Sequence, residues 1–146
     1  MSHGEYAIPC VIDWVVASMR GNDAMNGYIG GRLSTFPQPA QMLYPALAYT
    51  AFSSHPCYVE GDVIVKTRVT FSLIAVDKGY DVSVIAPIYA KAHQILHAEF
   101  DATTKDRGVL GKILSCKVVG DVYYSEEDDE KVTWQYLGKT YEVEVQ

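Results

Sequence analysis

Residues 63–76 (VIVKTRVTFSLIAV) alternate between apolar and polar side chains over an unusual length. One side is apolar apart from one threonine and carries Val63, Val65, Thr67, Val69, Phe71, Leu73 and Ala75. The other side is polar and carries Lys66, Arg68, Thr70 and Ser72. Because successive side chains of a strand point to opposite faces, the pattern predicts a strand with one face on a core. At about 3.3 Å per residue it would span roughly 45 Å, which is long for a single domain.

The segment that follows changes period from two residues to between three and four. After turn residues Asp77 and Gly79, the apolar positions fall on one helical stripe: Ile85, Ile88, Tyr89, Ala92, Ile95, Leu96 and Phe100. This spacing predicts an amphipathic helix of about five turns that covers the strand. Pro87 is unfavourable inside a helix, so with Ser83 as the N-cap we expect the regular helix to start late or to bend in its first turn.

Shorter elements are expected on both sides of this pair. Two N-terminal helices are predicted at residues 8–19 and 23–29, the second capped by Asn22 or Asp23 and ended by Gly30-Gly31. Extended segments are predicted at residues 32–36, 46–54, 113–124 and 132–145, with a proline-rich loop at 37–45.

We make three further predictions about the faces and the ends of these strands. The strand at 46–54 should end at His55-Pro56 and form a hairpin with the long strand. The strand at 113–124 should present one apolar face, made by Leu114, Cys116, Val118, Val122 and Tyr124. The apolar phase of residues 132–145 shifts near Gly138, which predicts a bulge or tight turn there.

The element order predicts an α+β fold made of one domain, residues 1–146. The expected architecture is an antiparallel or mixed sheet with a long central strand, one main amphipathic helix packed on it, and the N-terminal helices. The chain is 49% apolar and 21% charged, as in ordinary globular proteins. No apolar run is long enough for a transmembrane helix, and the start of the chain is unlike a signal peptide.

Composition also narrows the function. The net charge of −6 argues against a general nucleic-acid binder, since phosphate neutralisation needs clustered Lys and Arg. The three cysteines are far apart and form no CxxC pair, so buried, reduced thiols are expected. No nucleophile motif and no phosphate-binding loop with its lysine is present. We therefore assign no catalytic residue and no cofactor.

Three groups of residues remain as candidates for a site. His93 and His97 are four residues apart on the main helix, but the glutamate of HExxH and a third ligand are missing, so ordinary boundary histidines are favoured over a zinc site. The acidic run reads as a solvated hairpin tip rather than a metal site and contains Glu126, Glu127, Asp128, Asp129 and Glu130. Lys66 and Arg68, on the polar face of the long strand, could form a subunit or lumen surface.

The order of several segments resembles a known family. A helix leads to Gly30-Gly31-Arg32, a proline-rich loop runs into YPALAY (residues 44–49), and VKTRVTFSLIA (65–75) precedes the helix IAPIYAKAHQIL (85–96). A closing pair of strands carries acidic residues between them. Over residues 8–146 this arrangement is similar to the tail completion or tail terminator proteins of long-tailed bacteriophages and gene transfer agents.

The resemblance implies a structural virion protein without catalytic activity. Such proteins form a ring, usually hexameric, that caps the head-proximal end of the tail tube, ends tube polymerisation and joins the tail to the head. The implied partners are further copies of the chain, the major tail tube protein and the head–tail connector or stopper, with DNA passing through the lumen. The implied location is the virion tail or neck, after assembly in the cytoplasm of the bacterial host.

Three alternatives stay open at this stage. A head completion or neck connector protein would share most of these features. A small metal-binding enzyme would use His93 and His97, and a ligand-binding module would need a deep apolar pocket with convergent polar groups. On the leading interpretation, we expect the long strand and the acidic hairpin to be the regions most involved in assembly. Deleting residues 125–131 should then impair ring formation or docking without preventing folding.

Overall fold

The computed structural model describes residues 6–35, 43–60, 63–79, 81–98 and 106–146, without the side chains of 58–60, 63–65 and 98. Its elements in chain order are α1 (Ala7–Arg20), α2 (Asp23–Ile29), β1 (Leu33–Thr35), β2 (Ala46–Glu60), β3 (Val63–Lys78), α3 (Ile85–Ala98), a short 3-10 turn (Gly108–Leu110), β4 (Ile113–Glu127) and β5 (Thr133–Val145). The predicted proline-rich loop and the expected end of the main helix at Phe100 fall largely outside the described residues.

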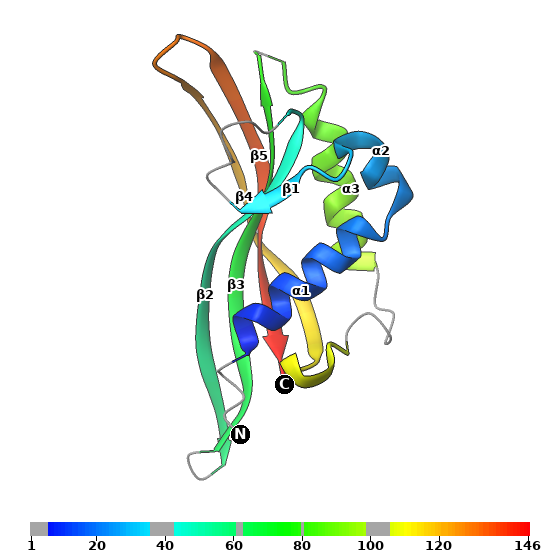
Figure 1. Ribbon diagram of the computed structural model, residues 1–146. Coiled ribbons are helices and arrows are strands. Elements are labelled where there is room, and N and C mark those ends of the chain that lie inside the picture. The colour runs from blue at the N-terminus through cyan, green and yellow to red at the C-terminus, as the bar shows by residue number, and fades with distance from the viewer. Residues whose placement is uncertain (1–5, 36–42, 61–62, 80, 99–105) are drawn as a thin grey trace.

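One mixed sheet with helices on a single face makes up the fold. The strand order is β1-β2-β3-β5-β4, with β1 parallel to β2 and every other pair antiparallel. The three α-helices cover one side of this sheet. The β4–β5 and β2–β3 hairpins extend beyond the helices at opposite ends of the molecule (Figure 1). The α+β class and the long central strand predicted from the sequence are confirmed.

The central strand and the main helix pack as their periodicities predict. The alternating apolar residues of β3 are buried from Val69 to Ala75, and the stripe of α3 buries Ile85, Ile88, Ala92, Ile95 and Leu96. Helix α3 begins at Ile85, so Pro87 lies in its first turn, where the missing N–H removes no helical hydrogen bond. The expected late start is confirmed. Ser83 is not the N-cap, however, because Val84 is the residue that immediately precedes the helix. The Ser83 hydroxyl donates to Asp81 Oδ2 instead, at 2.8 Å.

The N-terminal helices complete the main core. In α1 the buried residues are Ala7, Cys10, Val11, Trp14, Val15 and Met19, whereas Ile8 and Ile12 are only half-buried. Helix α2 is capped as predicted, since the Asn22 side chain accepts a hydrogen bond from the Met25 N–H and Gly30 adopts the left-handed conformation. The buried cysteines are Cys10 and Cys116, and Cys57 is half-buried; all three are free thiols.

Strand β2 does not end at His55-Pro56, so that expectation is wrong. It continues to Glu60, and Pro56 pairs with Thr67 of β3. Strand β1 pairs only with Leu47–Tyr49, so the outer side of β2 beyond Tyr49 has no neighbouring strand among the described residues. A proline is tolerated on such an edge because its missing N–H interrupts no ladder on that side.

The predicted bulge at Gly138 is also absent. Strand β5 pairs with β3 in one continuous register from Lys78↔Trp134 to Thr67↔Val145. The two apolar phases of β5 lie on opposite faces of the sheet. Tyr141, Val143 and Val145 join the main core, and Tyr136 joins a second apolar cluster on the other face with Ala48, Ile74 and Val76.

Strand β4 lacks the single apolar face that its sequence predicts. Its register against β5 shifts between Ile113 and Ser115 and again between Val118 and Gly120, so that Leu114 and Val119 are extra residues. The side chain of Leu114 is exposed as a result. Because each shift inverts the alternation, Val118 packs on the main core and Val122 packs on the second cluster.

In the described ranges, no helix is both long and apolar enough to cross a bilayer.

Candidate assembly surfaces

A ladder of charged side chains covers the lower part of the sheet face that the helices leave open. Lys66 Nζ lies 3.1 Å from Glu144 Oε2, and Arg68 Nε lies 3.3 Å from Glu142 Oε1. Glu142 also receives Lys117 Nζ from β4 at 3.2 Å. The register causes this arrangement, because Arg68 is opposite Glu144 in the β3–β5 ladder and Lys117 is opposite Glu142 in the β4–β5 ladder. We name Lys66, Arg68, Lys117, Glu142 and Glu144 the charge ladder.

The charge ladder defines the charge pattern of this surface but contributes little to the stability of the fold. Its side chains are partly exposed, and exposed ion pairs contribute about 0–1 kcal/mol each. Hydroxyl groups continue the polar face upward, where Ser72 Oγ and Thr140 Oγ1 are 2.9 Å apart. Lys66 and Arg68 therefore lie on a surface in which positive and negative charges nearly balance.

The acidic run forms the tip of the β4–β5 hairpin, as predicted. One carboxylate organises the turn: Asp128 Oδ1 accepts the N–H groups of Glu130 at 2.9 Å and Val132 at 3.0 Å, while Oδ2 accepts the Trp134 indole N–H at 2.8 Å. The Trp134 bond and then the backbone bonds hold the pKa of Asp128 below its ordinary value. Glu126 accepts the Tyr136 hydroxyl at 2.6 Å. Two of the five acidic residues thus build the hairpin, and all five are exposed.

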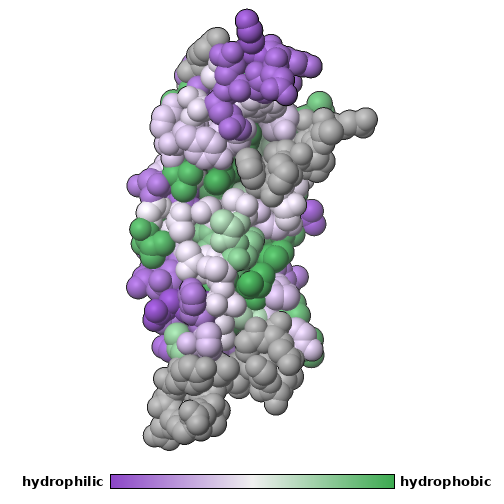
Figure 2. Space-filling model, turned by 90° about the vertical axis from the view of Figure 1, so that its left-hand side faces the viewer, coloured by the Kyte–Doolittle hydropathy of each residue, from purple (hydrophilic) through white to green (hydrophobic). Residues whose placement is uncertain are grey.

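The two predicted groups of site residues do not form one site. Arg68 and Lys78 are ten positions apart on β3, which corresponds to roughly 33 Å along the strand, and Lys78 pairs with Trp134 next to the acidic tip. Figure 2 faces the side of the molecule away from the helices and shows hydrophilic surface at its top and again lower down. A mixed band with hydrophobic patches lies between them.

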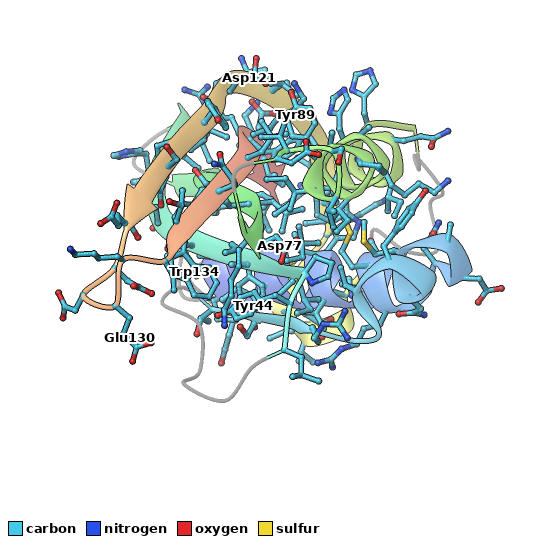
Figure 3. All side chains as sticks on the ribbon, turned by 90° about the horizontal axis from the view of Figure 1, so that it is seen from above. Tyr44, Asp77, Tyr89, Asp121, Glu130 and Trp134 are labelled. Carbon is cyan, nitrogen blue, oxygen red and sulfur yellow. The ribbon has the colours of Figure 1, made fainter. Side chains whose placement is uncertain are left out.

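Aromatic side chains that the sequence analysis did not single out support the base of the hairpin. Tyr44 meets Trp134 edge-on with ring centroids 4.7 Å apart, and Tyr124 stacks on Tyr136 at 4.4 Å. Lys78 Nζ lies 5.2 Å from the Trp134 ring centroid. Figure 3 shows Tyr44 and Trp134 side by side, with Glu130 farther out on the tip. The even-numbered aromatic phase of residues 132–136 was the available signal for this second cluster.

The histidines belong to a polar cluster between α3 and the sheet. Their rings stack, with centroids 5.1 Å apart, and His93 Nδ1 lies 3.4 Å from the Tyr141 hydroxyl. Desolvation, followed by the charges of Lys139 and His97, lowers the pKa of His93. Burial raises the pKa of Tyr141. Within the described parts of the chain, no group of three His, Cys, Asp or Glu side chains could hold a metal ion, so the zinc alternative gains no support.

A second part of this cluster ties β4 to α3. Asp121 accepts hydrogen bonds from Lys139 Nζ at 2.6 Å and from the Tyr89 hydroxyl at 2.8 Å. Figure 3 shows Tyr89 and Asp121 approaching each other from the helix and the strand. These two hydrogen bonds connect α3, β4 and β5 through one carboxylate.

A shallow groove of about 290 Å³ lies between α2 and α3, and its lining residues are Ala24, Tyr28, Pro87, Ala90, Lys91 and Gln94. This groove differs from the deep apolar pocket that a ligand-binding module would need. The groove is open, and two of its polar side chains, Lys91 and Gln94, bond to each other at 3.2 Å.

Comparison with known proteins identifies the fold. No protein-family model matches the chain, and no curated protein matches its sequence. A chain from the solved structure of the virion of a native gene transfer agent (GTA) particle is similar in structure, with a TM-score of 0.67. The match covers 90% of each chain at 8% sequence identity. At this identity the likeness establishes a shared fold over nearly the whole chain.

Proposed function

We propose that this chain is a structural protein of a phage-like tailed particle and forms a hexameric ring at the head-proximal end of the tail tube. The observation that carries the proposal is the shared fold with a chain of a gene transfer agent virion, which extends over 90% of both chains. The family resemblance in the sequence narrows the role to the tail terminator. In this role the ring ends tube polymerisation and joins the tail to the head.

The two ends of the molecule differ in charge, as expected if each end of the ring contacts a different partner protein. Residues 126–131 place five carboxylates and one lysine at the end of the β4–β5 hairpin, whereas the charge ladder at the other end is nearly balanced. One end would meet the tail tube protein and the other the head–tail connector, while DNA passes through the lumen without being read in sequence. The protein would be assembled into the virion in the cytoplasm of the bacterial host.

A non-catalytic role agrees with the chemistry of the described residues. The titratable side chains that cluster there are joined in ion pairs and hydrogen bonds that hold strands and helices together. Unlike an active site, these clusters direct no unpaired nucleophile or base into a cleft.

Electron microscopy of the purified protein, alone and mixed with tail tubes that lack it, tests the proposal. We expect rings, and density that caps one end of each tube and stops further growth when tube subunits are added. Binding to filled heads but not to tubes would instead assign the protein to head completion or the neck connector. Monomers that bind neither tubes nor heads would overturn the proposal.

A further inference from the structure

Two free edges of the sheet lie at the same height on opposite sides of the molecule. Among the described residues, no strand pairs with the outer side of β4 or with the outer side of β2 beyond Tyr49. The ladders connect the two edges row by row. One row runs Ser53, Thr70, Glu142 and Lys117, and the next equivalent row runs His55, Arg68, Glu144 and Ser115.

The strand directions match a neighbouring copy that has the same orientation. Strands β2, β3, β5 and β4 are successively antiparallel, so β4 runs opposite to β2. If a second copy stands beside the first without being turned over, its β2 is antiparallel to the β4 of the first. Copies related by rotation about a ring axis keep this orientation, and each contact joins two different surfaces. A two-fold dimer would instead place β4 against β4.

Both edges lack the charged residues that usually protect an exposed strand. Residues 46–57 contain no Asp, Glu, Lys or Arg, and residues 113–120 contain only Lys117, which is paired with Glu142. Monomeric proteins commonly place lysines on such edges to prevent pairing between molecules. Here the β4 edge instead exposes two aliphatic bulge residues, Leu114 at 39% and Val119 at 50%.

The helices leave both edges accessible. All three lie on one face of the sheet (Figure 1). The bulges at Leu114 and Val119 enclose one regular segment of β4, residues 115–118. On β2 the register is regular from Ser53 to Cys57, and Pro56 within it has no N–H to donate. Residues 115–117 and residues 53–55 therefore lie in the same rows of the sheet, and neither segment contains a bulge.

We infer that residues 115–117 of β4 pair antiparallel with residues 53–55 of β2 in the next copy, with Lys117 opposite Ser53 and Ser115 opposite His55, so that the sheet continues from subunit to subunit. The inference rests on the proposed ring and specifies its contact. Leu114 and Val119 flank the paired segment and are covered by the neighbouring copy. The face opposite the helices, with its charge ladder, then lines one side of a continuous sheet.

Two edge variants test this arrangement. The first changes the β2 edge at two exposed positions, Ser53→Lys and Ser54→Lys, and the second changes the exposed bulge residues of β4, Leu114→Lys and Val119→Lys. A control variant adds two lysines at exposed helical positions, Ala17→Lys and Gly27→Lys. Circular dichroism and thermal unfolding verify that all three fold.

We expect the control to form rings like the wild-type chain and each edge variant alone to be monomeric in native mass spectrometry. An equimolar mixture of the two edge variants should form dimers and nothing larger, because each pair retains one intact β4 edge and one intact β2 edge. A second readout uses Ser53→Cys with Lys117→Cys in a Cys57→Ser chain, whose rings should yield disulfide-linked chains on oxidation.

The outcomes separate this inference from the proposed function. Wild-type rings together with rings of either edge variant would overturn the edge pairing and leave the proposed function intact. The same conclusion follows if the mixture gives no dimers and the cysteine variant gives no linked chains. Wild-type chains that form no rings, alone or on tubes, would overturn the proposed function itself.

Discussion

Gly138 lies opposite Ile74 in the ladder between β5 and β3, so close to its partner strand that a side chain has no room. A Cβ atom at position 138 would stand 2.7 Å from the Ile74 Cα atom and 2.9 Å from the Leu73 carbonyl carbon. Both obstacles are backbone atoms of a central strand and cannot turn away. We expect Gly138→Ala to lower the free energy of unfolding by about 1–3 kcal/mol, the usual effect of overpacking.

Urea denaturation of Gly138→Ala, compared with that of Gly120→Ala, measures this effect. Gly120→Ala is the matched control, since a Cβ atom there meets nothing within 4 Å. Equal midpoints for Gly138→Ala and Gly120→Ala would contradict the close approach.

The same glycine shows where reasoning from the sequence succeeds and where it fails. The period-two pattern of β3 and the helical stripe of α3 depend on local alternation, and both elements appear as predicted. The change of apolar phase at Gly138 was interpreted as a bulge because one buried face was assumed. The sheet instead buries apolar residues on both faces, and Trp134 and Tyr136 have their own cluster.

Errors in the remaining strands have a related cause. The bulges that expose Leu114 and Val119 are set by pairing with β5, and no single strand reveals its partner's register. Pro56 was interpreted as the end of β2, but it lies on a strand edge, where its missing N–H is tolerated. The sequence identified Lys66, Arg68 and the acidic run but not Lys117, Glu142 and Glu144. The separation of the two surfaces by roughly 33 Å follows only from the assembled ladder.

Thr67 occupies a position on the apolar face of β3 where its hydroxyl contributes nothing favourable. The side chain is 1% exposed, and Oγ1 has no hydrogen-bond partner among the described residues. Replacing the hydroxyl by a methyl group of similar size removes an unsatisfied buried polar atom. Thr67→Val should therefore raise the free energy of unfolding by about 1–3 kcal/mol.

Chemical denaturation with Thr140→Val as the matched variant tests this prediction. Thr140 Oγ1 is bonded to Ser72 Oγ at 2.9 Å, so this change removes a hydrogen bond and should not stabilise the chain. A destabilised Thr67→Val protein would show that the Thr67 hydroxyl has a partner in the folded state.

Asp128 makes the hairpin tip sensitive to acid. Its pKa in the folded chain lies below the ordinary value of 3.8, mainly because the carboxylate accepts the Trp134 indole N–H. A lowered pKa means that the ionised form stabilises the hairpin above pH 3.8. This contribution is lost as the pH falls through the lower pKa of the folded state.

The indole N–H resonance of Trp134 reports this change directly in a pH titration. It should move toward the position of a solvent-exposed indole only below pH 3.8. In Asp128→Asn the resonance should not titrate, whereas Asp129→Asn should behave like the wild type. Unchanged titration in Asp128→Asn would assign the effect to another carboxylate.

The acidic tip can be neutralised without removing the residues that fold it. Glu127→Gln, Asp129→Asn and Glu130→Gln together eliminate three negative charges and keep Asp128 and Glu126, which bond Trp134 and Tyr136. The variant should unfold at the wild-type urea concentration, because exposed charges contribute little to stability. If the tip contacts a partner, the yield of joined heads and tails should fall at least tenfold in a reconstitution assay. Wild-type yields would exclude the acidic charges from that contact.

The charge ladder should determine how strongly the open face of the sheet binds DNA. In the wild-type chain Glu142 and Glu144 neutralise Lys66, Arg68 and Lys117, so duplex DNA should bind weakly. Glu142→Gln with Glu144→Gln leaves three cations unpaired. Fluorescence anisotropy should then detect DNA binding at low salt, with a slope of about −2.7 in log K against log salt if all three cations contact phosphates. Glu127→Gln with Glu130→Gln changes the net charge equally but leaves the ladder intact, and it should bind no better than the wild type. Equal gains in both variants would attribute the effect to net charge instead of to the ladder.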